Sequence, residues 1–390
     1  MTWPTATLGD VSELHYGRAL EGYHSEPDGE SVARVFGTNG PIGWAKSALT
    51  DSPTIIVGRK GAYRGVHFSD GPSWTIDTAY YTEIRSDLVD LKWFYYRLLL
   101  LDINALNSGA AIPSTRREDF YTLRIALPGI DSQRRISQVL SAYDDLIEIN
   151  RRRIALLEEA ARLLYQEWFI HFRFPGHEHR KVVNGLPSGW DIRLLSELCR
   201  LGDGIQTGPF GSQLHQSDYA EVGVPVVMPK DIQGFRIQTE GVARIPEFLA
   251  DRLGRHRMEV GDTVYGRRGD IGRRAFIGRR QVGWLCGTGC LRIRPDPNKI
   301  VPRYLFETLG SQQTAGFIAN QAKGSTMPNL SAGSLQKVPI LYPPLSVQKL
   351  FAGEIEPTIE FSEILTEQNK KLAQARDLLL PRLMSGEIAA

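Results

Sequence analysis

The 390-residue sequence is poor in cysteine and has no long apolar run. Its three cysteines, Cys199, Cys286 and Cys290, are too few for a disulfide framework, and the last two have no second pair to complete a zinc site. No N-terminal stretch resembles a signal peptide, and no segment approaches the roughly 20 apolar residues that span a bilayer. We therefore expect a protein of the reducing cytoplasm.

Sequence signatures of catalysis are also missing. No glutamate is followed two places later by lysine, as in many nucleases, and no Asn-Pro-Pro or Asp-Pro-Pro run precedes an aromatic residue, as in enzymes that methylate an extruded base. The glycine-rich segment 202–208 has the wrong spacing for a dinucleotide loop, so we interpret it as a tight turn that brings the backbone close to a partner. His177 and His179 could form a metal pair, but a solvated linker is the more common role of such residues. The sequence thus predicts no catalytic residue, no metal and no cofactor in this chain.

The net charge of +2 is nearly neutral but hides a basic cluster. Between residues 252 and 294, eleven arginines stand against three acidic residues, a local excess of eight positive charges. Concentrated positive charge favours phosphate binding, because affinity rises with the number of counterions released. A solvated basic face explains the cluster equally well.

The chain repeats itself once. Three motifs recur at a single offset of 215, namely 112–114 at 327–329, 127–128 at 342–343, and 133–134 at 348–349. The run 148–152 recurs at 367–371, so the second copy has gained four residues there, about one helical turn. Upstream, the Gly-Arg-Lys-Gly run at 58–61 pairs with Gly-Arg-Arg-Gly at 266–269. Each half is therefore a globular unit followed by a long helix, in agreement with a length that favours two or more domains.

The segment after each globular unit has helical periodicity. Apolar residues over 136–168 alternate at spacings of four and three, a heptad seam that predicts a helix over about 133–172. The second copy, over about 348–386, is less regular, and Pro357 and Pro381 should kink or break it.

Two equivalent seams in one chain predict that the helices pack on each other as an antiparallel spacer. Asn150 and Asn369 occupy equivalent places near its middle. A buried Asn at a seam position specifies register at some cost in stability, so replacing Asn150 with Leu should preserve or raise stability and loosen the register.

The globular units are richer in strand signals than the helical segments. Short β-rich runs, such as 53–58, 75–85 and 263–266, are separated by Gly, Pro, Asn and Asp turns, and an amphipathic helix is expected near 91–101. We predict an α+β fold of two similar strand-rich globular domains joined by two long antiparallel coiled-coil helices, with pseudo-two-fold symmetry. The predicted boundaries are 1–130 for the first domain, 131–173 for the first helix, 174–189 for a linker, 190–344 for the second domain and 345–390 for the second helix.

Several motifs together carry a family resemblance. The segments 205–215 and 224–232 closely resemble the opening of target-recognition domains in the specificity subunits of type I restriction-modification systems, and 35–44 resembles a second version of it. The Pro-Leu-x-x-Gln entry at 344–348, degraded at 129–133, belongs to the same pattern. The order and duplication of these motifs extend the resemblance over nearly the whole chain.

The resemblance implies a non-catalytic, sequence-specific DNA-binding subunit. Such subunits bind double-stranded DNA and two modification subunits that methylate adenine with S-adenosylmethionine, and they can recruit ATP-driven restriction subunits. Both cofactors are thus expected on partner subunits. A pseudo-two-fold reader suits a target of two half-sites with an unread spacer.

The two halves should read different sequences, which makes the bipartite target asymmetric. Aligning Trp3 with Trp190, an offset of 187, and Gln133 with Gln348, an offset of 215, leaves the second unit 28 residues longer. The proposed reading loops also differ, since 37–40 and 207–211 have unrelated sequences.

We assign DNA contact to polar loop residues, because arginine can read guanine, Gln and Asn can read adenine, and Lys mostly holds phosphate. About half of such residues would only cap turns or pair with carboxylates. The predicted contacts are Thr38, Asn39, Arg59, Lys60, Tyr63 and Arg64 in the first unit, and Gln206, Gln213, His215, Lys230, Arg267, Arg268, Arg273 and Lys323 in the second.

Two other classes of function share parts of this pattern. A coiled-coil adaptor that binds no DNA would share the helices but would not need eleven arginines in one globular unit. A specificity component of another methylation-based defence system would share the fold, but should be fused to a catalytic domain. Duplex binding, measured with and without a co-expressed methylase, separates the three.

Overall fold

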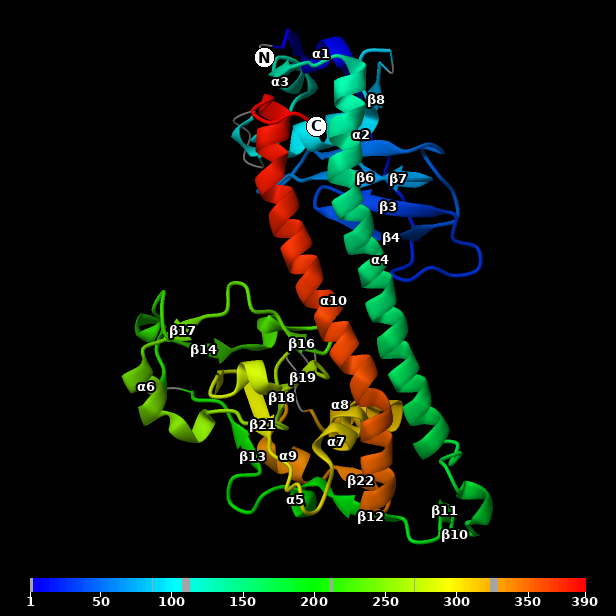
Figure 1. Cartoon of the computed structure of the whole chain (residues 1–390), viewed down its shortest axis with the longest axis vertical. Coiled ribbons are helices and arrows are strands. Elements are labelled where there is room, and N and C mark those ends of the chain that lie inside the picture. The colour runs from blue at the N-terminus through cyan, green and yellow to red at the C-terminus, as the bar shows by residue number, and fades with distance from the viewer. Residues whose placement is uncertain (1–2, 86, 107–112, 211–212, 270, 323–328) are drawn as a thin grey trace. The chain divides into compact units, whose positions relative to one another are not determined.

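The longest elements of the computed structural model are two helices, α4 (Ile130–Phe169) and α10 (Leu345–Ser385), of 40 and 41 residues (Figure 1). The structure describes all residues except 1–2, 86, 107–112, 211–212, 270 and 323–328. The chain divides into unit 1, residues 1–153 with 364–390, and unit 2, residues 154–363. Each unit therefore holds one globular part and a portion of both long helices.

The globular part of unit 1 is built on a four-stranded antiparallel sheet of order β2-β8-β5-β6. A three-stranded sheet of order β4-β3-β7 and the pair β1–β9 complete it. The elements are β1 (Thr5–Thr7), α1 (Leu8–Val11), β2 (Ser12–Tyr16), β3 (Ala33–Gly37), β4 (Gly40–Ala45), β5 (Thr54–Gly58), β6 (Val66–Ser69), β7 (Ser73–Thr75), β8 (Ala79–Ile84), α2 (Leu91–Leu99), α3 (Arg117–Tyr121) and β9 (Arg124–Ala126).

The globular part of unit 2 repeats this plan. Its four-stranded sheet has the order β13-β21-β18-β19, its three-stranded sheet β17-β14-β20, and β12 pairs with β22. The elements are β12 (Asp191–Leu194), α5 (Leu195–Leu198), β13 (Ile205–Thr207), β14 (Val224–Val227), β15 (Ile232–Gln233), β16 (Arg236–Ile237), β17 (Arg244–Ile245), α6 (Glu247–Arg252), β18 (Thr263–Gly266), β19 (Arg274–Phe276), β20 (Leu285–Cys286), β21 (Cys290–Ile293), α7 (Pro302–Gly310), α8 (Gln312–Gln321), α9 (Ala332–Gln336) and β22 (Pro339–Tyr342). The same strand order in both sheets confirms the internal repeat.

The central strands form where β-branched residues are buried on both faces. Every residue of β5, with the sequence Thr-Ile-Ile-Val-Gly, and of β14, with Val-Pro-Val-Val, is buried. The predicted helix near 91–101 is present as α2, whose Asp90 side chain caps the backbone N–H of Trp93.

Both long helices enter the core of each unit, where they run antiparallel. In unit 1, Ile136 and Leu140 of α4 share a buried cluster with Leu380 and Leu383 of α10. In unit 2, a second cluster contains Tyr165, Trp168 and Phe169 of α4 together with Phe351 and Ile355 of α10. The heptad seam of the sequence is thus a buried helix–helix interface, and the predicted α+β architecture is confirmed.

The prolines of the second helix do not break it. Pro357 and Pro381 lie inside α10, which is helical from Leu345 to Ser385. Both prolines are exposed, so water can satisfy the carbonyl groups that lose their helical donors. The expected break in the helix was therefore wrong, and the alternative expectation of a kink stays a prediction.

A buried glutamine fixes the start of each long helix. The Gln133 side chain donates to the Pro128 carbonyl at 2.8 Å and accepts from the Asp90 amide at 2.9 Å. Gln348 likewise donates to the Pro343 carbonyl at 2.7 Å and accepts from the Val301 amide at 3.0 Å. The glutamine of the sequence motif therefore ties the entry of a long helix to the first turn of α2 or α7.

The expected linker has some structure of its own. A short antiparallel hairpin pairs β10 (Val182–Val183) with β11 (Leu186–Pro187). His177 and His179 are exposed, and both lie within ion-pair distance of Glu178. Among the described residues, no group of three potential ligands could hold a metal ion, and no helix is long and apolar enough to cross a membrane.

Candidate nucleic-acid interface

A dibasic turn follows the second strand of the main sheet in each unit and is held by the same backbone bonds. In unit 1 the Arg59 amide donates to the Thr78 carbonyl, and the Arg59 carbonyl accepts from the Thr115 amide, both at 2.9 Å. A single antiparallel bridge pairs Lys60 with Ser114. Each turn is thus pinned between two other segments of its unit.

The turn of unit 2 repeats these contacts at equivalent positions. The Arg267 amide donates to the Gly289 carbonyl at 2.9 Å, and the Arg267 carbonyl accepts from the Leu330 amide at 2.8 Å. Arg268 forms the bridge with Asn329. The same backbone frame thus holds two basic residues at a fixed place on each globular part.

The other predicted residues of unit 1 gather beside its dibasic turn. Thr38 and Asn39 form the two-residue turn between β3 and β4, and the Thr38 carbonyl accepts from the Gly65 amide at 3.0 Å. Asn39 is exposed, and Tyr63, in the connection between β5 and β6, is 66% exposed. The structure therefore brings these loops together as one polar surface.

The side chains of the unit 1 turn are oriented by their neighbours. The Arg59 guanidinium lies 4.7 Å from the centre of the Tyr16 ring and donates to the Asp77 carbonyl at 3.0 Å. The Lys60 ammonium lies 3.6 Å from the Asp77 carboxylate. Both residues keep part of their surface exposed, so they are preorganised without being buried.

Arg64 has a structural role in place of the predicted DNA contact. Its side chain is 2% exposed, and Nη2 donates to the carbonyls of Ile103, Asn104 and Leu106 at 3.3, 2.9 and 2.8 Å. Nη1 donates to the Gly61 carbonyl at 3.1 Å. The guanidinium holds the connection after α2 and is directed away from solvent.

In unit 2, Lys230 lies near the dibasic turn. Lys230 is exposed and directly follows Pro229. The Pro229 ring packs closely on Gly289, where an added Cβ would lie 3.1 Å from it. Gly289 in turn accepts a hydrogen bond from the Arg267 amide of the dibasic turn. The Arg267 Nε donates to the Asn329 side chain at 3.2 Å, whereas Arg268 and Arg273 are exposed.

The remaining predictions for unit 2 are more dispersed. Gln206 lies in β13, where its side-chain carbonyl accepts from Arg292 at 3.2 Å. His215 is exposed and Gln213 half-buried, but Leu214 between them packs into a separate cluster with Val224 and Leu249. Lys323 lies outside the described residues.

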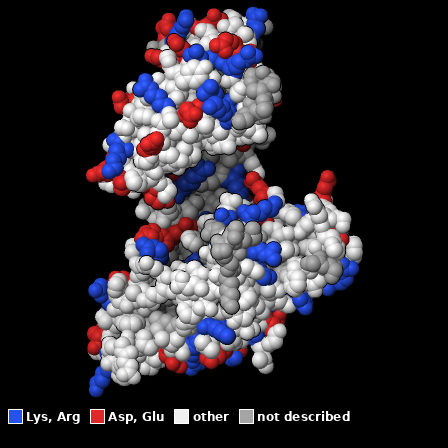
Figure 2. Space-filling model, turned by 180° about the vertical axis from the view of Figure 1, so that it is seen from behind, with Lys and Arg blue, Asp and Glu red and all other residues white. Residues whose placement is uncertain are grey.

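The basic cluster of the sequence is divided by burial. Arg292 and Arg294 are buried and pair with Asp203 and Asp262, while Arg257 pairs with Glu247 and Asp251. Although burial opposes it, the two arginines hold the pKa of Asp203 below its ordinary value. On the face in Figure 2, basic and acidic side chains are interspersed. The excess of arginine is thus partly structural, and neither interpretation of the cluster accounts for it alone.

A glycine in each unit explains the predicted close approach of the backbone. A Cβ on Gly17 would lie 2.1 Å from the Ile76 carbonyl oxygen, and one on Gly208 would lie 1.9 Å from that of Gly287. Only glycine fits directly after β2 and β13, where the backbone passes close to Ile76 or Gly287. The partner of the glycine-rich segment 202–208 is therefore another part of the same unit.

The family model of the type I restriction modification DNA specificity domain matches residues 1–159 and 187–374 of this chain. The chain belongs to this family. It is 21% identical over 411 residues to the specificity subunit of the type I restriction enzyme MjaVIII from Methanocaldococcus jannaschii, covering 99% of this chain and 93% of that protein. The MjaIX specificity subunit of the same organism is 22% identical over 351 residues, with 86% and 77% covered.

A solved structure shows the same fold. The S subunit of a type I restriction-modification system from M. genitalium superposes with a TM-score of 0.60 at 18% identity, covering 98% of this chain and 96% of that one. Family membership confirms the predictions that the chain is a specificity subunit, that it recognises DNA sequence and that it is a non-catalytic component of its system.

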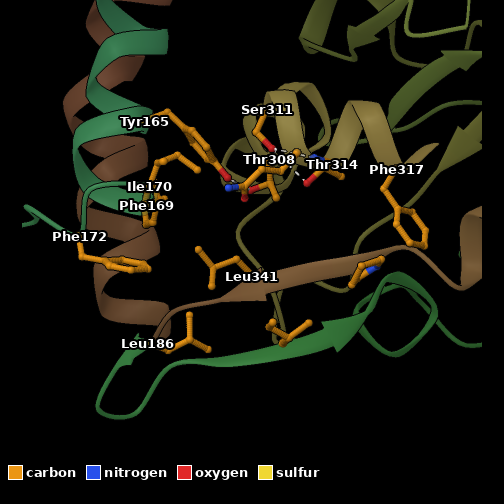
Figure 3. Close-up of a pocket in the computed structure, with 13 residues that line it drawn as sticks. Tyr165, Phe169, Ile170, Phe172, Leu186, Thr308, Ser311, Thr314, Phe317 and Leu341 are labelled. Atoms are coloured by element: carbon orange, nitrogen blue, oxygen red, sulfur yellow. Dashed lines mark hydrogen bonds between the residues drawn. The ribbon is translucent and has the colours of Figure 1, made fainter. Parts of the chain in front are cut away.

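The specificity subunit has a pocket of about 340 Å³ in unit 2 that none of the predicted site residues lines. Figure 3 shows Tyr165 and Phe169 of α4 facing Thr308, Thr314 and Leu341. Burial raises the pKa of Tyr165 to about 12, and its hydroxyl donates to Thr308 at 3.3 Å.

The sequence predictions missed one cation beside the unit 1 turn. The Arg117 guanidinium lies 4.6 Å from the centre of the same Tyr16 ring that carries Arg59. Its sequence signal is its place two residues after Thr115, which pairs with Arg59. Ala332 occupies the equivalent position of the repeat, so this feature is restricted to the first unit.

Proposed function

We propose that this specificity subunit reads an asymmetric, bipartite double-stranded DNA target through the dibasic turns and neighbouring loops of its two globular parts. The observation that carries the proposal is the duplicated frame, in which Arg59 and Arg267 make the same two backbone bonds. Equivalent cations on two equivalent sheets suit two separate contacts with one duplex, with phosphate contacts setting position and base contacts setting sequence.

Differences around the shared frame support an asymmetric target. Unit 1 places Thr38 and Asn39 beside its turn, whereas unit 2 places Lys230 there, and only unit 1 has Arg117 stacked on Tyr16. Since different side chains present different donors and acceptors to the base edges, the two half-sites should differ in sequence.

The second element of the proposal is that two adenine-methylating subunits dock on the long helices. Apolar side chains remain exposed on the face of α4 that does not join the buried seam: Val139, Leu146 and Ile149 in unit 1, and Leu156 and Leu163 in unit 2. Their spacings are multiples or near-multiples of a helical turn, as for a second helix–helix seam. A helix of a partner subunit fits such a surface, and the repeat provides for two partners.

In this proposal the chemistry belongs to the partners. S-adenosylmethionine is bound by the methylating subunits and ATP by restriction subunits that join the complex in the cytoplasm. This chain contributes target recognition and placement, and it binds neither cofactor.

The proposal is tested by mapping methylated adenines genome-wide in a host that expresses this chain with its modification subunits. The expected result is one motif with two different half-sites and a gap of fixed length. A continuous palindrome, or a motif that tolerates any gap, contradicts it. Absence of duplex binding by the purified complex would favour the coiled-coil adaptor.

A further inference from the structure

One hairpin in the globular part of unit 2 contacts both long helices. Strands β15 and β16 pair Ile232 with Ile237 and Gln233 with Arg236. Both isoleucines are buried in a cluster with Val227 and Val264, so the hairpin is anchored in the sheet core. Its last strand presents Arg236 to the helices.

Arg236 joins three elements through a single nitrogen. Its Nη2 donates to Glu158 of α4 at 2.7 Å and to the Ser362 hydroxyl of α10 at 2.8 Å. Ser362 is buried, and its hydroxyl donates in turn to the Ile359 carbonyl at 2.7 Å. We call Arg236, Glu158 and Ser362 the unit 2 clip.

The surroundings of the clip make its geometry specific. The side chains of Arg236 and Glu158 are only 26% and 36% exposed, and burial raises the pKa of Glu158 although Arg236 opposes this. Nearby, Arg303 of α7 lies 3.6 Å from Glu356 of α10. Hydrogen bonds to a partly desolvated ion pair are directional, whereas apolar contacts between the same surfaces are not.

Unit 1 has a clip that joins the same three kinds of element, its globular part, α4 and α10, with different chemistry. Tyr96 of α2 is fully buried and donates to Asp144 of α4, which also accepts from Arg376 of α10. We call these three residues the unit 1 clip. One residue from the globular part and one from each helix again come together, here at the Asp144 carboxylate of α4, whereas in unit 2 they meet at the Arg236 guanidinium of the globular part.

The two clips are not copies produced by the repeat. Tyr96 aligns with Glu307, because Trp93 and Tyr304 are equivalent, and Arg236 comes from the hairpin between β14 and β17. Two unrelated sets of residues thus make the same three-way connection, which indicates a shared requirement on each unit.

We infer that the two clips are positioning residues that hold each globular part at a fixed angle on the helices and thereby restrict the gap between the half-sites. The inference rests on the proposed bipartite reading. The glutamines tie each globular part to the entry of one long helix, and the clips add a directional contact that involves both helices. A shift of about 3.4 Å at its reading loops equals one base-pair step.

The test compares the motif of the wild-type complex with that of Arg236→Ala, using methylated-adenine mapping in the same host. The expected result is that Arg236→Ala keeps both half-site sequences but raises methylation of sites with a gap one base pair longer or shorter by about tenfold, as for loss of one charged hydrogen bond. Ser362→Ala, which keeps the ion pair, should give a smaller increase.

Two controls separate positioning from general damage. Arg162→Ala removes an exposed arginine that pairs with Glu159 on the same helix, so the gap should stay fixed. The charge exchange E158R with R236E restores the pair and should restore the single gap. A merely destabilising change would lower methylation at all sites and leave the gap preference unchanged.

The outcomes distinguish the two proposals. A wild-type complex that methylates a continuous site overturns the bipartite reading and the clips with it. A wild-type motif of fixed gap that Arg236→Ala and Ser362→Ala also keep overturns the clips alone. Altered half-site bases in Arg236→Ala would make Arg236 a reading residue and likewise overturn the positioning role.

Discussion

Asn150 of α4 donates through Nδ2 to the side-chain oxygen of Asn369 of α10 at 3.0 Å, within the helix–helix seam of unit 1. The two residues are equivalent in the internal repeat, so the hydrogen bond joins a residue to its own copy. Asn369 also donates to the Ile147 carbonyl at 3.3 Å. Asn150 is buried and Asn369 half-buried, and this amide pair is satisfied in one register only, which aligns the two helices.

The paired replacement N150L with N369L should raise the free energy of unfolding by about 1 kcal/mol, because one buried and one half-buried amide give way to apolar packing. Asn150→Leu alone should be less stable than the double variant, since the side-chain oxygen of Asn369 then has no donor from Asn150. Urea denaturation measures both. A double variant clearly less stable than the wild type would contradict the alignment role.

The twin glutamines should be stability determinants of similar size. Gln133→Ala and Gln348→Ala each leave a buried amide or carbonyl without its partner and should cost about 2 kcal/mol. Gln313→Ala is the control, because Gln313 is exposed and its loss should change stability by less than about 0.5 kcal/mol. Equal effects of the three variants in thermal denaturation would refute this role.

The duplicated plan could be predicted because the sequence can be compared with itself. Gln133 and Gln348, or Asn150 and Asn369, align at fixed offsets whatever their surroundings, and helical periodicity shows which face is buried. Pairs of residues that are far apart in the sequence and bond in the fold show no such pattern. Asp203 lies 89 residues from Arg292, so counting charges between residues 252 and 294 could not show that this arginine is neutralised.

Individual contact residues were harder to predict than the loops that carry them. Lys60 and Arg64 lie on the same short connection, yet Arg64 turns inward to the carbonyls of the segment after α2 while Lys60 stays partly exposed. The exposed prolines of α10 show the same limit, because their tolerance depends on which face of the helix meets water.

Acid should destabilise unit 2 through His256. Burial, with Arg255 and Arg292 nearby, lowers the pKa of His256 to about 4, and its Nε2 accepts from Arg255 at 3.1 Å. The unfolded chain takes up this proton near pH 6.5 and the folded chain does not, so stability is complete above pH 6.5 and falls as the pH drops towards 4.

The expected loss from this histidine is on the order of 2 kcal/mol at pH 4.5. His256→Gln should flatten the pH dependence of the unfolding free energy between pH 4.5 and 7, measured by urea denaturation. An unchanged slope would show that His256 does not titrate in this way.

Docking of the methylating subunits should depend on the exposed apolar face of α4. Leu146→Glu and Leu156→Glu place a charge on that face and should lower co-purification of the modification subunit at least about tenfold, while stability changes little because both side chains are exposed. Arg152→Ala is the control, because Arg152 is exposed and pairs with Glu148 on the same helix. Normal assembly of both glutamate variants would place the docking surface elsewhere.

The dibasic turns should divide into residues that hold the duplex and residues that read it. Lys230→Ala should weaken binding to all duplexes alike and reduce the slope of log affinity against log salt by about 0.9, as for one lost phosphate contact. Replacing Arg267, which the Asn329 side chain holds, with Ala should instead cost roughly 1 to 3 kcal/mol of discrimination at a single base pair.

Arg64→Ala should destabilise unit 1 without a base-specific effect, because the Arg64 guanidinium bonds to backbone carbonyls within the fold. Fluorescence anisotropy with matched and mismatched duplexes at several salt concentrations measures all three. If alanine at the exposed predicted residues of both units left site-specific binding intact, the assignment of the interface would be wrong.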